Sequence, residues 1–317
     1  MIEIRNLVKY YGDNLAVNDV SFTVEKGEIL GFLGPNGAGK TTTMNIVTGF
    51  LSATSGSVTI NGYDILDNPK MAKSCIGYLP ENPPLYLDMT VIEYLKFVAD
   101  LKGVTHDDRI KHLAGIMKLV RITDVANRLI KNLSKGYRQR VGIAQALVGN
   151  PEVLILDEPT VGLDPKQIIE IRNLIKELGK AHTVILSSHI LPEVQAVCER
   201  VVIINKGVIA AIDTPEGLSH KMAKTSKVQI VAEGPAREIV HKLRLLPGVR
   251  NAELFLEKEK GLNIFEIEND PENDVRKQIF FEMARNSWPI IEMKSMDPTL
   301  EEIFLQVTSN NPGKKGS

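Results

Sequence analysis

The chain has 317 residues, of which 43% are apolar and 24% are charged, and this composition excludes a fibrous or fully disordered protein. At about 150 residues per domain, the length predicts two domains. Lys and Arg number 38 against 39 Asp and Glu, so the net charge of −1 does not indicate nucleic acid or an anionic membrane as a partner.

The sequence shows no secretory or membrane-spanning pattern. The first residues, MIEIRNLVKYYGD, carry charges where a signal peptide needs an apolar core. No stretch approaches the roughly 18 uncharged apolar residues of a membrane span, so we expect any membrane role to act through a partner. Cys75 and Cys198 are too far apart for a disulfide framework and fit a reducing cytosol. We interpret each as a small buried hydrophobic residue, with a reactive thiol as the alternative.

The first two hundred or so residues alternate short apolar runs with longer helical patterns, which predicts an α/β domain. The runs are rich in β-branched residues, as is typical of strands buried on both faces in a partly parallel sheet. They are Ile29–Leu33, Val153–Leu156, Val184–Leu186 and Val201–Ile204.

Residues from about 90 to 148 are predicted to be almost entirely helical, which indicates a helical insertion in the α/β domain. The best-formed helix spans Thr90–Leu101, because Thr90 and Glu93 match a capping box. Its predicted buried face consists of Val91, Tyr94, Leu95, Val98 and Leu101.

The composition changes after Thr214-Pro215, and the remaining residues predict a second domain. The order of its elements is β-α-β-β-α-β, that of a ferredoxin-like split βαβ unit. We expect strands near 228–232, 249–257, 262–268 and 290–296, helices over 235–245 and about 273–286, and a turn over 258–261.

The predicted second domain, 226–309, is acidic, with 11 Lys and Arg against 15 Asp and Glu, which is unlike an RNA-binding surface. A last helix is predicted to start at Asp297, and the tail 310–317 is predicted to be frayed. The apolar face of that helix would consist of Leu300, Ile303, Phe304 and Val307. Whether this domain dimerises, regulates or only packs stays open.

A phosphate-binding loop follows the first buried strand. Residues 34–41, GPNGAGKT, match G-x-x-x-x-G-K-[ST] and precede a predicted helix over Thr41–Val47. Glycines let backbone N–H groups turn toward phosphates, and the helix N-terminus adds a favourable dipole. We expect Lys40 to reach the β- and γ-phosphates and Thr41 to ligate Mg²⁺; a glycine-rich turn without a ligand is the alternative. The predicted nucleotide contacts here are Gly34, Asn36, Gly37, Ala38, Gly39, Lys40, Thr41 and Thr42.

Two acidic residues follow the buried run Val153–Leu156. Asp157 and Glu158 would lie at the carboxyl edge of the sheet, where ligands bind in open α/β folds. We expect Asp157 to hold Mg²⁺, through water, and Glu158 to orient and polarise an attacking water. Two such acids alone could equally cap a helix, but the phosphate loop favours the catalytic interpretation.

Further short motifs stand around these acids. Residues 133–140 read LSKGYRQR, residues 162–164 read GLD, Ser188-His189 follows the run TVIL, and Tyr11 precedes Gly12. Over about residues 1–218 the chain thereby resembles the ABC ATPases. The four stretches are similar to that family's signature sequence, D-loop, switch histidine and adenine-stacking aromatic residue, respectively.

The resemblance implies a role for each motif. The start of a helix over 135–148 would bind the γ-phosphate of ATP held by the opposite subunit, through Ser134, Lys135, Gly136 and Tyr137. His189 would contact the γ-phosphate of its own subunit, and Asp164 would link the two sites. Each residue has a structural alternative: Ser134 as a helix N-cap, His189 as a hydrogen-bonded loop residue, and Tyr11 (or its weaker rival Tyr10) as an ordinary strand aromatic.

Two positions depart from the commonest family pattern. Lys135 and Tyr137 stand where many members have Gly and Gln, and we expect function to be retained because Lys135 adds a cation near the phosphate. Glu81, within GYLPENPP, stands where the family usually has a Gln that touches Mg²⁺ and couples to the membrane partner. A carboxylate can still ligate Mg²⁺, so we expect Glu81 to face the metal and not to be a surface carboxylate. The alternative is a solvent-facing loop cap.

The run LPENPPLY and residues 296–305 are similar to the ATPase subunits of ABC-2-type exporters, especially the gliding-motility-type branch. The resemblance implies a P-loop ABC ATPase domain over 1–218, a mixed sheet with a helical subdomain at about 85–150, plus a ferredoxin-like accessory domain over 226–309. It further implies a head-to-tail, ATP-dependent homodimer. That dimer would hydrolyse ATP with Mg²⁺ to power a separate ABC-2-type permease, from the cytoplasm on the inner face of the cell membrane.

Two other functions stay open. Non-transport ABC ATPases that act on ribosomes or DNA usually carry two cassettes, or a coiled-coil or zinc insertion. This chain has one phosphate loop, one signature and no Cys cluster, so we expect no nucleic-acid partner. A regulatory protein that holds ATP without turnover is the other possibility, and the presence of Asp157, Glu158 and His189 argues against it.

Overall fold

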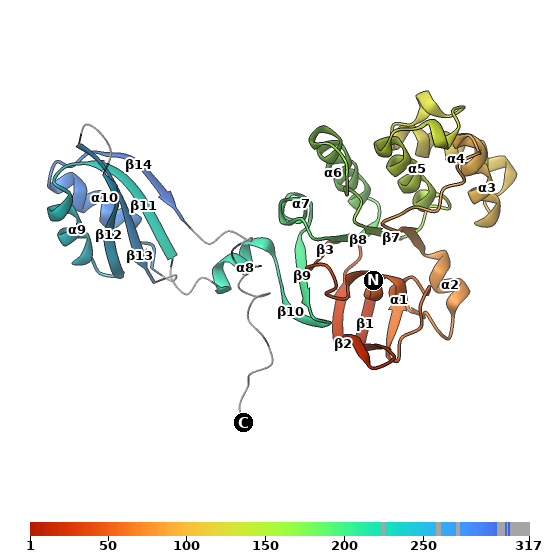
Figure 1. Ribbon diagram of the computed structural model, residues 1–317, viewed down its shortest axis with the longest axis horizontal. Helices are drawn as coiled ribbons and strands as arrows, with labels where there is room; N and C mark the ends of the chain where they lie inside the picture. The colour runs from red at the N-terminus through yellow and green to blue at the C-terminus, as the bar shows by residue number, and fades with distance from the viewer. Residues whose placement is uncertain (223–225, 258–260, 271–272, 297–301, 303, 305–317) are drawn as a thin grey trace. The chain divides into compact units, whose positions relative to one another are not determined.

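The computed structural model describes the chain except residues 223–225, 258–260, 271–272, 297–301, 303 and 305–317 (Figure 1). It divides into two compact units between Pro215 and Glu216, and each unit has its own core. The predicted last helix lies outside the described residues, apart from Glu302 and Phe304, as do the tail and most of the turn at 258–261. Among the described helices, none is long and apolar enough to cross a membrane.

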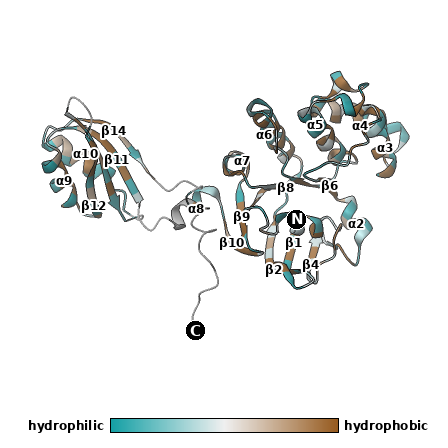
Figure 2. Cartoon of the chain, in the orientation of Figure 1, coloured by the Kyte–Doolittle hydropathy of each residue, from teal (hydrophilic) through white to brown (hydrophobic). Residues whose placement is uncertain are grey.

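A six-stranded mixed sheet forms the centre of the first unit, in the order β10-β9-β3-β8-β7-β6. The strands from β6 to β9 run parallel, and only β10 is antiparallel to its neighbour. They are β3 (Ile29–Leu33), β6 (Ile76–Leu79), β7 (Val153–Asp157), β8 (Thr183–Ser188), β9 (Arg200–Asn205) and β10 (Val208–Asp213). Every residue of β3, β7 and β8 is buried, and Figure 2 shows apolar colouring along these strands. The predicted partly parallel sheet is confirmed.

A second sheet, with the order β2-β1-β4-β5, is antiparallel. It consists of β1 (Ile2–Tyr11), β2 (Asn14–Val24), β4 (Ser55–Ile60) and β5 (Tyr63–Asp64). One hydrophobic core joins both sheets to α1 (Lys40–Val47), with Phe22 of β2 stacked on Phe32 of β3 at 5.4 Å between ring centroids. This shared core fixes the start of α1 between the two sheets.

The segment between β6 and β7 forms the predicted helical insertion. Its elements are α3 (Val91–Leu101), α4 (His106–Leu119), η1 (Thr123–Val125), η2 (Ile130–Asn132) and α5 (Lys135–Leu147). The capping box of Thr90 and Glu93 is present at the start of α3. The expectation that Leu101 is buried was wrong: its side chain is 71% exposed, because the helix ends there and the chain turns away at Gly103.

The other helices of this unit pack around the sheet. They are α2 (Pro69–Ser74), α6 (Pro165–Gly179) and α7 (Leu191–Val197), and α8 (Pro215–Met222) starts at the division between the units. Figure 1 shows α5, α6 and α7 on one side of the six-stranded sheet, with α1 and the antiparallel sheet on the other.

The second unit is a four-stranded antiparallel sheet, in the order β12-β13-β11-β14, covered on one face by two helices. Its elements are β11 (Ser226–Glu233), α9 (Ala236–Arg244), β12 (Val249–Glu257), β13 (Leu262–Asn269), α10 (Arg276–Arg285) and β14 (Ile290–Ser295). Alternate residues of β11, Val228, Ile230 and Ala232, face the helices. The assignment of 226–309 as a ferredoxin-like accessory domain stays a prediction.

Strand β6 packs tightly against α5 at Gly77. A Cβ on Gly77 would overlap the backbone carbonyl oxygen of Ala146, which cannot move without shifting α5. We expect Gly77→Ala to lower the free energy of unfolding by about 1–3 kcal/mol, the usual cost of overpacking. The matched control is Gly115→Ala in α4, where the added methyl meets open space and should stabilise the helix by about 0.5–1 kcal/mol. Urea unfolding followed by circular dichroism measures both, and an unchanged Gly77→Ala midpoint would contradict the packing.

Candidate functional site

A pocket of about 780 Å³ opens where β3, β7 and β8 end. Ten residues expected from the sequence line it: Tyr11, Asn36, Gly37, Gly39, Lys40, Thr41, Thr42, Glu81, Glu158 and His189. Gly34 and Ala38 belong to the same loop but do not line the pocket. The structure thus brings together residues from five separate stretches of the sequence.

The phosphate loop owes its shape to glycine. Gly39, the residue before α1, has φ 103°, and a Cβ there would lie 2.7 Å from the carbonyl oxygen of Ala16. Lys40 is buried, and its Nζ donates hydrogen bonds to the carbonyl oxygens of Gly34 (2.8 Å) and Pro35 (3.3 Å). The ammonium group therefore holds the loop curled at the N-terminus of α1, which is the setting of an anion-binding site.

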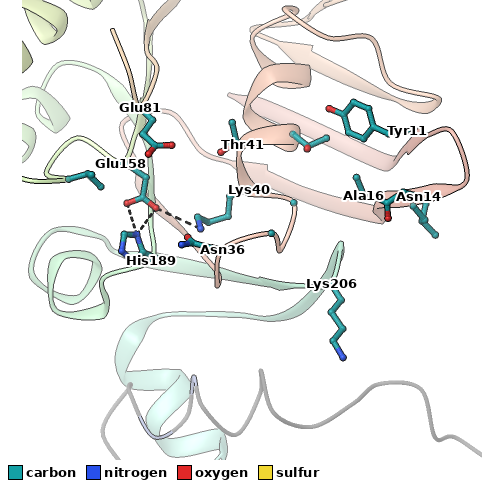
Figure 3. Close-up of a pocket in the computed structure, with 15 residues that line it drawn as sticks. Tyr11, Asn14, Ala16, Asn36, Lys40, Thr41, Glu81, Glu158, His189 and Lys206 are labelled. Atoms are coloured by element: carbon teal, nitrogen blue, oxygen red, sulfur yellow. Dashed lines mark hydrogen bonds and ion pairs between the residues drawn. The ribbon is translucent and has the colours of Figure 1, made fainter.

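Glu158 lies between two basic side chains. Its carboxylate is 2.9 Å from Nδ1 of His189 and 3.7 Å from Nζ of Lys40 (Figure 3). Burial raises the pKa of Glu158, whereas the hydrogen bond from His189 and the charge of Lys40 lower it. Glu158 has φ 49° and donates its backbone N–H to the carbonyl oxygen of Ser187, so the sheet edge holds it in a left-handed conformation that is uncommon for a non-glycine residue.

Asp157, the last residue of β7, is fully buried, and neither of its carboxylate oxygens has a hydrogen-bond partner among the described residues. Burial raises the pKa of Asp157 and the charge of Glu81 adds to this, while Ser187, Lys40 and Thr41 act in the opposite direction. An unpartnered buried carboxylate is costly, and a bound cation would relieve that cost.

The residues around Asp157 fit Mg²⁺ that arrives with a nucleotide. Within the described part of the chain, no group of three or more His, Cys, Asp and Glu side chains is arranged to hold a metal. Mg²⁺ is usually bound through one or two carboxylates together with substrate phosphates. Asp157 and the hydroxyl of Thr41 at the pocket wall are the residues that would supply the protein's share of such a site.

Glu81 differs from the expectation. It lines the pocket and raises the pKa of Asp157, but it is exposed, so the expectation that it is not a surface carboxylate was wrong. The cause is its position just beyond the end of β6, the edge strand of the sheet, where no further strand covers it. Figure 3 shows its carboxylate facing the same space as Glu158.

The signature residues lie apart from the pocket. Ser134 is the N-cap of α5 and accepts a hydrogen bond from the backbone N–H of Tyr137, and Asp164 caps α6 in the same way. Ser134, Lys135 and Asp164 are exposed. None of the predicted residues of the signature and the D-loop lines the pocket: Ser134, Lys135, Gly136, Tyr137 and Asp164. The capping role given as the alternative for Ser134 is therefore present, and the three exposed side chains are accessible to a second molecule.

The hydroxyl of Tyr137 is engaged within the chain. It donates a hydrogen bond of 2.8 Å to the carboxylate of Asp124 in η1, and this bond raises the pKa of Tyr137. The side chain therefore connects α5 to η1.

Tyr11 and Tyr10 are distinguished by position. Tyr11, 48% exposed, lines the pocket at the far end from Glu158, whereas Tyr10 does not line it (Figure 3). The ammonium of Lys9 lies 5.5 Å from the Tyr11 ring centroid. The free ring face offers a surface for a planar base.

Sequence reasoning missed part of the pocket wall. The additional lining residues are Asn14, Leu15, Ala16, Val161 and Lys206. Most reach the pocket through long-range contacts, such as the bond from Gly207 N–H to the Ala38 carbonyl oxygen that sets the β9–β10 turn against the phosphate loop. No local motif marks such positions.

Comparison with known proteins agrees with this geometry. The family described as "ABC transporter" matches residues 17–161. The linearmycin resistance ATP-binding protein LnrL of Bacillus subtilis (strain 168) is 33% identical, covering 97% of this chain and 98% of its own length. YhcH of the same organism, an uncharacterized ABC transporter ATP-binding protein, is 35% identical over 97% of this chain and 96% of its length.

Solved structures give the same result for the first unit. An ATP-binding subunit of an ABC transporter has a TM-score of 0.65 at 30% identity, covering 70% of this chain and 93% of that structure. The ATP-binding cassette MJ0796, solved as a dimer in a post-hydrolysis state with ADP and Pi, has a TM-score of 0.62 at 26% identity, covering 68% and 98%. ABC ATPases bind and hydrolyse ATP with Mg²⁺, and their cassettes dimerise. The chain belongs to this family and is an ATP-binding subunit of an ABC transporter.

Proposed function

We propose that the chain is the ATP-hydrolysing subunit of an ABC-2-type exporter, and that it works as a head-to-tail homodimer beside a separate permease on the inner face of the membrane. The observation that carries the proposal is the separation, within one chain, of the pocket from the exposed signature residues. In a head-to-tail pair, each pocket receives the signature of the other copy. The full-length similarity to a resistance ATP-binding protein supports export.

The chemistry follows from the contacts of Glu158. Its carboxylate is hydrogen-bonded to His189 and lies 3.7 Å from the ammonium of Lys40. A γ-phosphate in the pocket attracts the same two donors, which leaves Glu158 as the general base that accepts a proton from the attacking water. Mg²⁺, when bound, spreads the charge that develops on the phosphate oxygens, and Asp157, Thr41 and Glu81 are the residues that would hold it.

The N-terminus of α5 supplies the contribution of the opposite subunit. Its free N–H groups and the hydroxyl of Ser134 present positive charge to a phosphate, and the exposed Lys135 adds a full cation. Asp164, at the start of α6, lies in the loop that follows Glu158 and would link the two sites across the dimer.

A groove of about 580 Å³ on the first unit supports a membrane partner. Apolar atoms dominate its wall, and Phe50, 82% exposed, stands at it. Pro80 and Asn82 line the groove on either side of Glu81, which itself lines the nucleotide pocket. A permease segment seated here would touch the loop that carries a metal-site carboxylate, so that docking and nucleotide state are coupled.

The permease partner is tested by a pull-down of the tagged chain from detergent-solubilised membranes of its own organism. We expect an integral membrane protein to co-purify, and Phe50→Ser to lose it because the groove loses its exposed aromatic side chain. The matched control, Ile110→Ser, replaces an exposed apolar residue of α4 that does not line the groove and should retain the partner. Recovery of ribosomes or DNA instead would contradict the transport function.

Hydrolysis is tested with Glu158→Gln. This variant keeps the phosphate loop and should bind Mg·ATP, but it should turn over about 10²–10⁴-fold more slowly because the base is lost. It should also accumulate as an ATP-bound dimer in size-exclusion chromatography. A phosphate-release assay with near wild-type turnover would remove Glu158 from this role.

The composite site is tested by comparing two variants. Lys40→Ala should lose ATP affinity in titrations on the monomer, because Lys40 serves the nucleotide of its own chain. Ser134→Arg should bind ATP almost as the wild type does but should neither dimerise nor hydrolyse it, because Ser134 serves the nucleotide of the other chain. Equal loss of monomer affinity in both variants would be incompatible with a shared site.

A further inference from the structure

The two layers of the second unit carry opposite charge. Helices α9 and α10 together contain six Lys and Arg against two Asp and Glu, whereas the four strands contain three against six. The acidic balance of 226–309, and the neutral balance of the whole chain, therefore conceal a basic helix layer. An anionic partner for this layer is not excluded by the overall charge.

The outer face of α10 combines this charge with exposed aromatic rings. Lys277, Phe281 and Arg285 are spaced at i, i+4 and i+8, on the side opposite to the buried Ile279 and Met283. Phe281 is 61% exposed, and the neighbouring Phe280, in edge contact with it at 5.6 Å between centroids, is 55% exposed. Adjacent exposed aromatic side chains on a helix mark an interaction surface.

The cations beside these rings are unpaired. Among the residues that the structure describes, Lys277 and Arg285 have no hydrogen bond or ion pair, although the charge of Lys277 lowers the pKa of Asp274. In contrast, Arg276 at the start of the helix pairs with Asp274, and Lys242 of α9 pairs with Glu282. The free positive charge is thus concentrated next to Phe280 and Phe281.

An apolar hollow of about 270 Å³ continues the surface beyond Phe280. It is lined by Met283, Trp288, Pro289 and Ile290, among others. Trp288 is the only tryptophan of the chain and is half-buried at this place. The helix face therefore offers protruding rings, flanking cations and a recess that accepts apolar groups.

We propose that this face of α10 binds the surface of an anionic phospholipid bilayer. Phe280 and Phe281 enter the boundary between headgroups and acyl chains, and Lys277 and Arg285 contact lipid phosphates. Aromatic residues with flanking Lys and Arg on one helix face are the chemistry of an interfacial helix. A second copy of the same face is disfavoured because it would place unpaired cations against each other. The proposal does not depend on the permease or on catalysis.

The experiment is co-sedimentation of the full-length protein, without nucleotide, with vesicles of pure phosphatidylcholine or of phosphatidylcholine in which a third of the lipid is phosphatidylglycerol. We expect binding to the anionic vesicles only, weakening as salt is raised. The fluorescence of Trp288 should shift to shorter wavelength on binding, because its recess adjoins the inserted rings.

Variants assign the binding to α10. Phe280→Ser with Phe281→Ser should weaken vesicle binding at least about tenfold, and Lys277→Gln or Arg285→Gln should each weaken it about fivefold. The matched control is Phe255→Ser, which removes an equally exposed ring from β12 and should bind vesicles like the wild type. All four proteins should keep the ATP turnover of the wild type, since none of these residues belongs to the pocket.

Three results would overturn the proposal. They are equal binding to neutral and anionic vesicles, vesicle binding that the double Phe variant retains, and a double Phe variant whose only change is its oligomeric state in analytical ultracentrifugation. The last result would assign the face to a protein contact. None of them bears on the permease pull-down or on the phosphate-release assay, so the two proposals fail separately.

Discussion

Two neighbouring carboxylates buried at the end of β7 impose the electrostatic constraint on which the site depends. Glu158 is in contact with Lys40 and His189. Neither carboxylate oxygen of Asp157 has a hydrogen-bond partner within the described residues, and only the nearby Lys40, Ser187 and Thr41 favour its ionised form. Leaving a buried polar group unpaired costs about 1–3 kcal/mol, and more when it is charged. A cation at Asp157 would offset this cost, and the proposed reaction brings one with the nucleotide. In the proposed reaction, Asp157 would help to hold Mg²⁺, and the γ-phosphate would compete with Glu158 for Lys40 and His189, which would leave Glu158 available as the base.

The N-terminus of α5, which would bind the nucleotide of the opposite subunit in the proposed dimer, contacts the loop that follows Glu158. Lys135, at the first position of α5, opposes the helix dipole and packs against Gly162, where a Cβ would overlap its ammonium group. Gly162 belongs to the loop that leads from Glu158 to Asp164 and α6. The surface that would face a second subunit in the proposed dimer and the proposed base, Glu158, are thus linked by a loop of only a few residues. A change in how α5 meets a phosphate can reach Glu158 through the side chain of Lys135 and the backbone of this loop.

Local sequence signals predicted much of this arrangement. The β-branched runs defined β3, β7, β8 and β9, because strands buried on both faces leave little choice of residue type. The glycines of the phosphate loop and the caps at Thr90 and Ser134 are short-range features, and all are present.

Positions set by long-range packing were not predictable in the same way. The exposure of Glu81 follows from β6 being an edge strand, and strand order is not written in any local pattern. Ala16 and Lys206 reach the pocket only because β2 and the β9–β10 turn pack on the phosphate loop. Leu101 has the helical spacing of a core residue but lies at the last position of α3, where the next turn that would bury it is missing.

Charged side chains without an ion-pair partner among the described residues support the proposals for both units, but the energetic cost of such a charge differs between a buried site and the surface. At Asp157 the lack of a hydrogen-bond partner is itself informative. A buried carboxylate without one lowers the free energy of unfolding, and a bound cation would offset that loss. At Lys277 and Arg285 the charges are exposed, and water solvates them at little cost. These two charges alone do not indicate a binding surface. The neighbouring rings of Phe280 and Phe281 do, because exposing apolar area to water is unfavourable. In the first unit, therefore, a buried carboxylate without a hydrogen-bond partner in the described part of the chain supports the proposed metal site. In the second unit, exposed aromatic rings flanked by Lys277 and Arg285 support the proposed lipid surface.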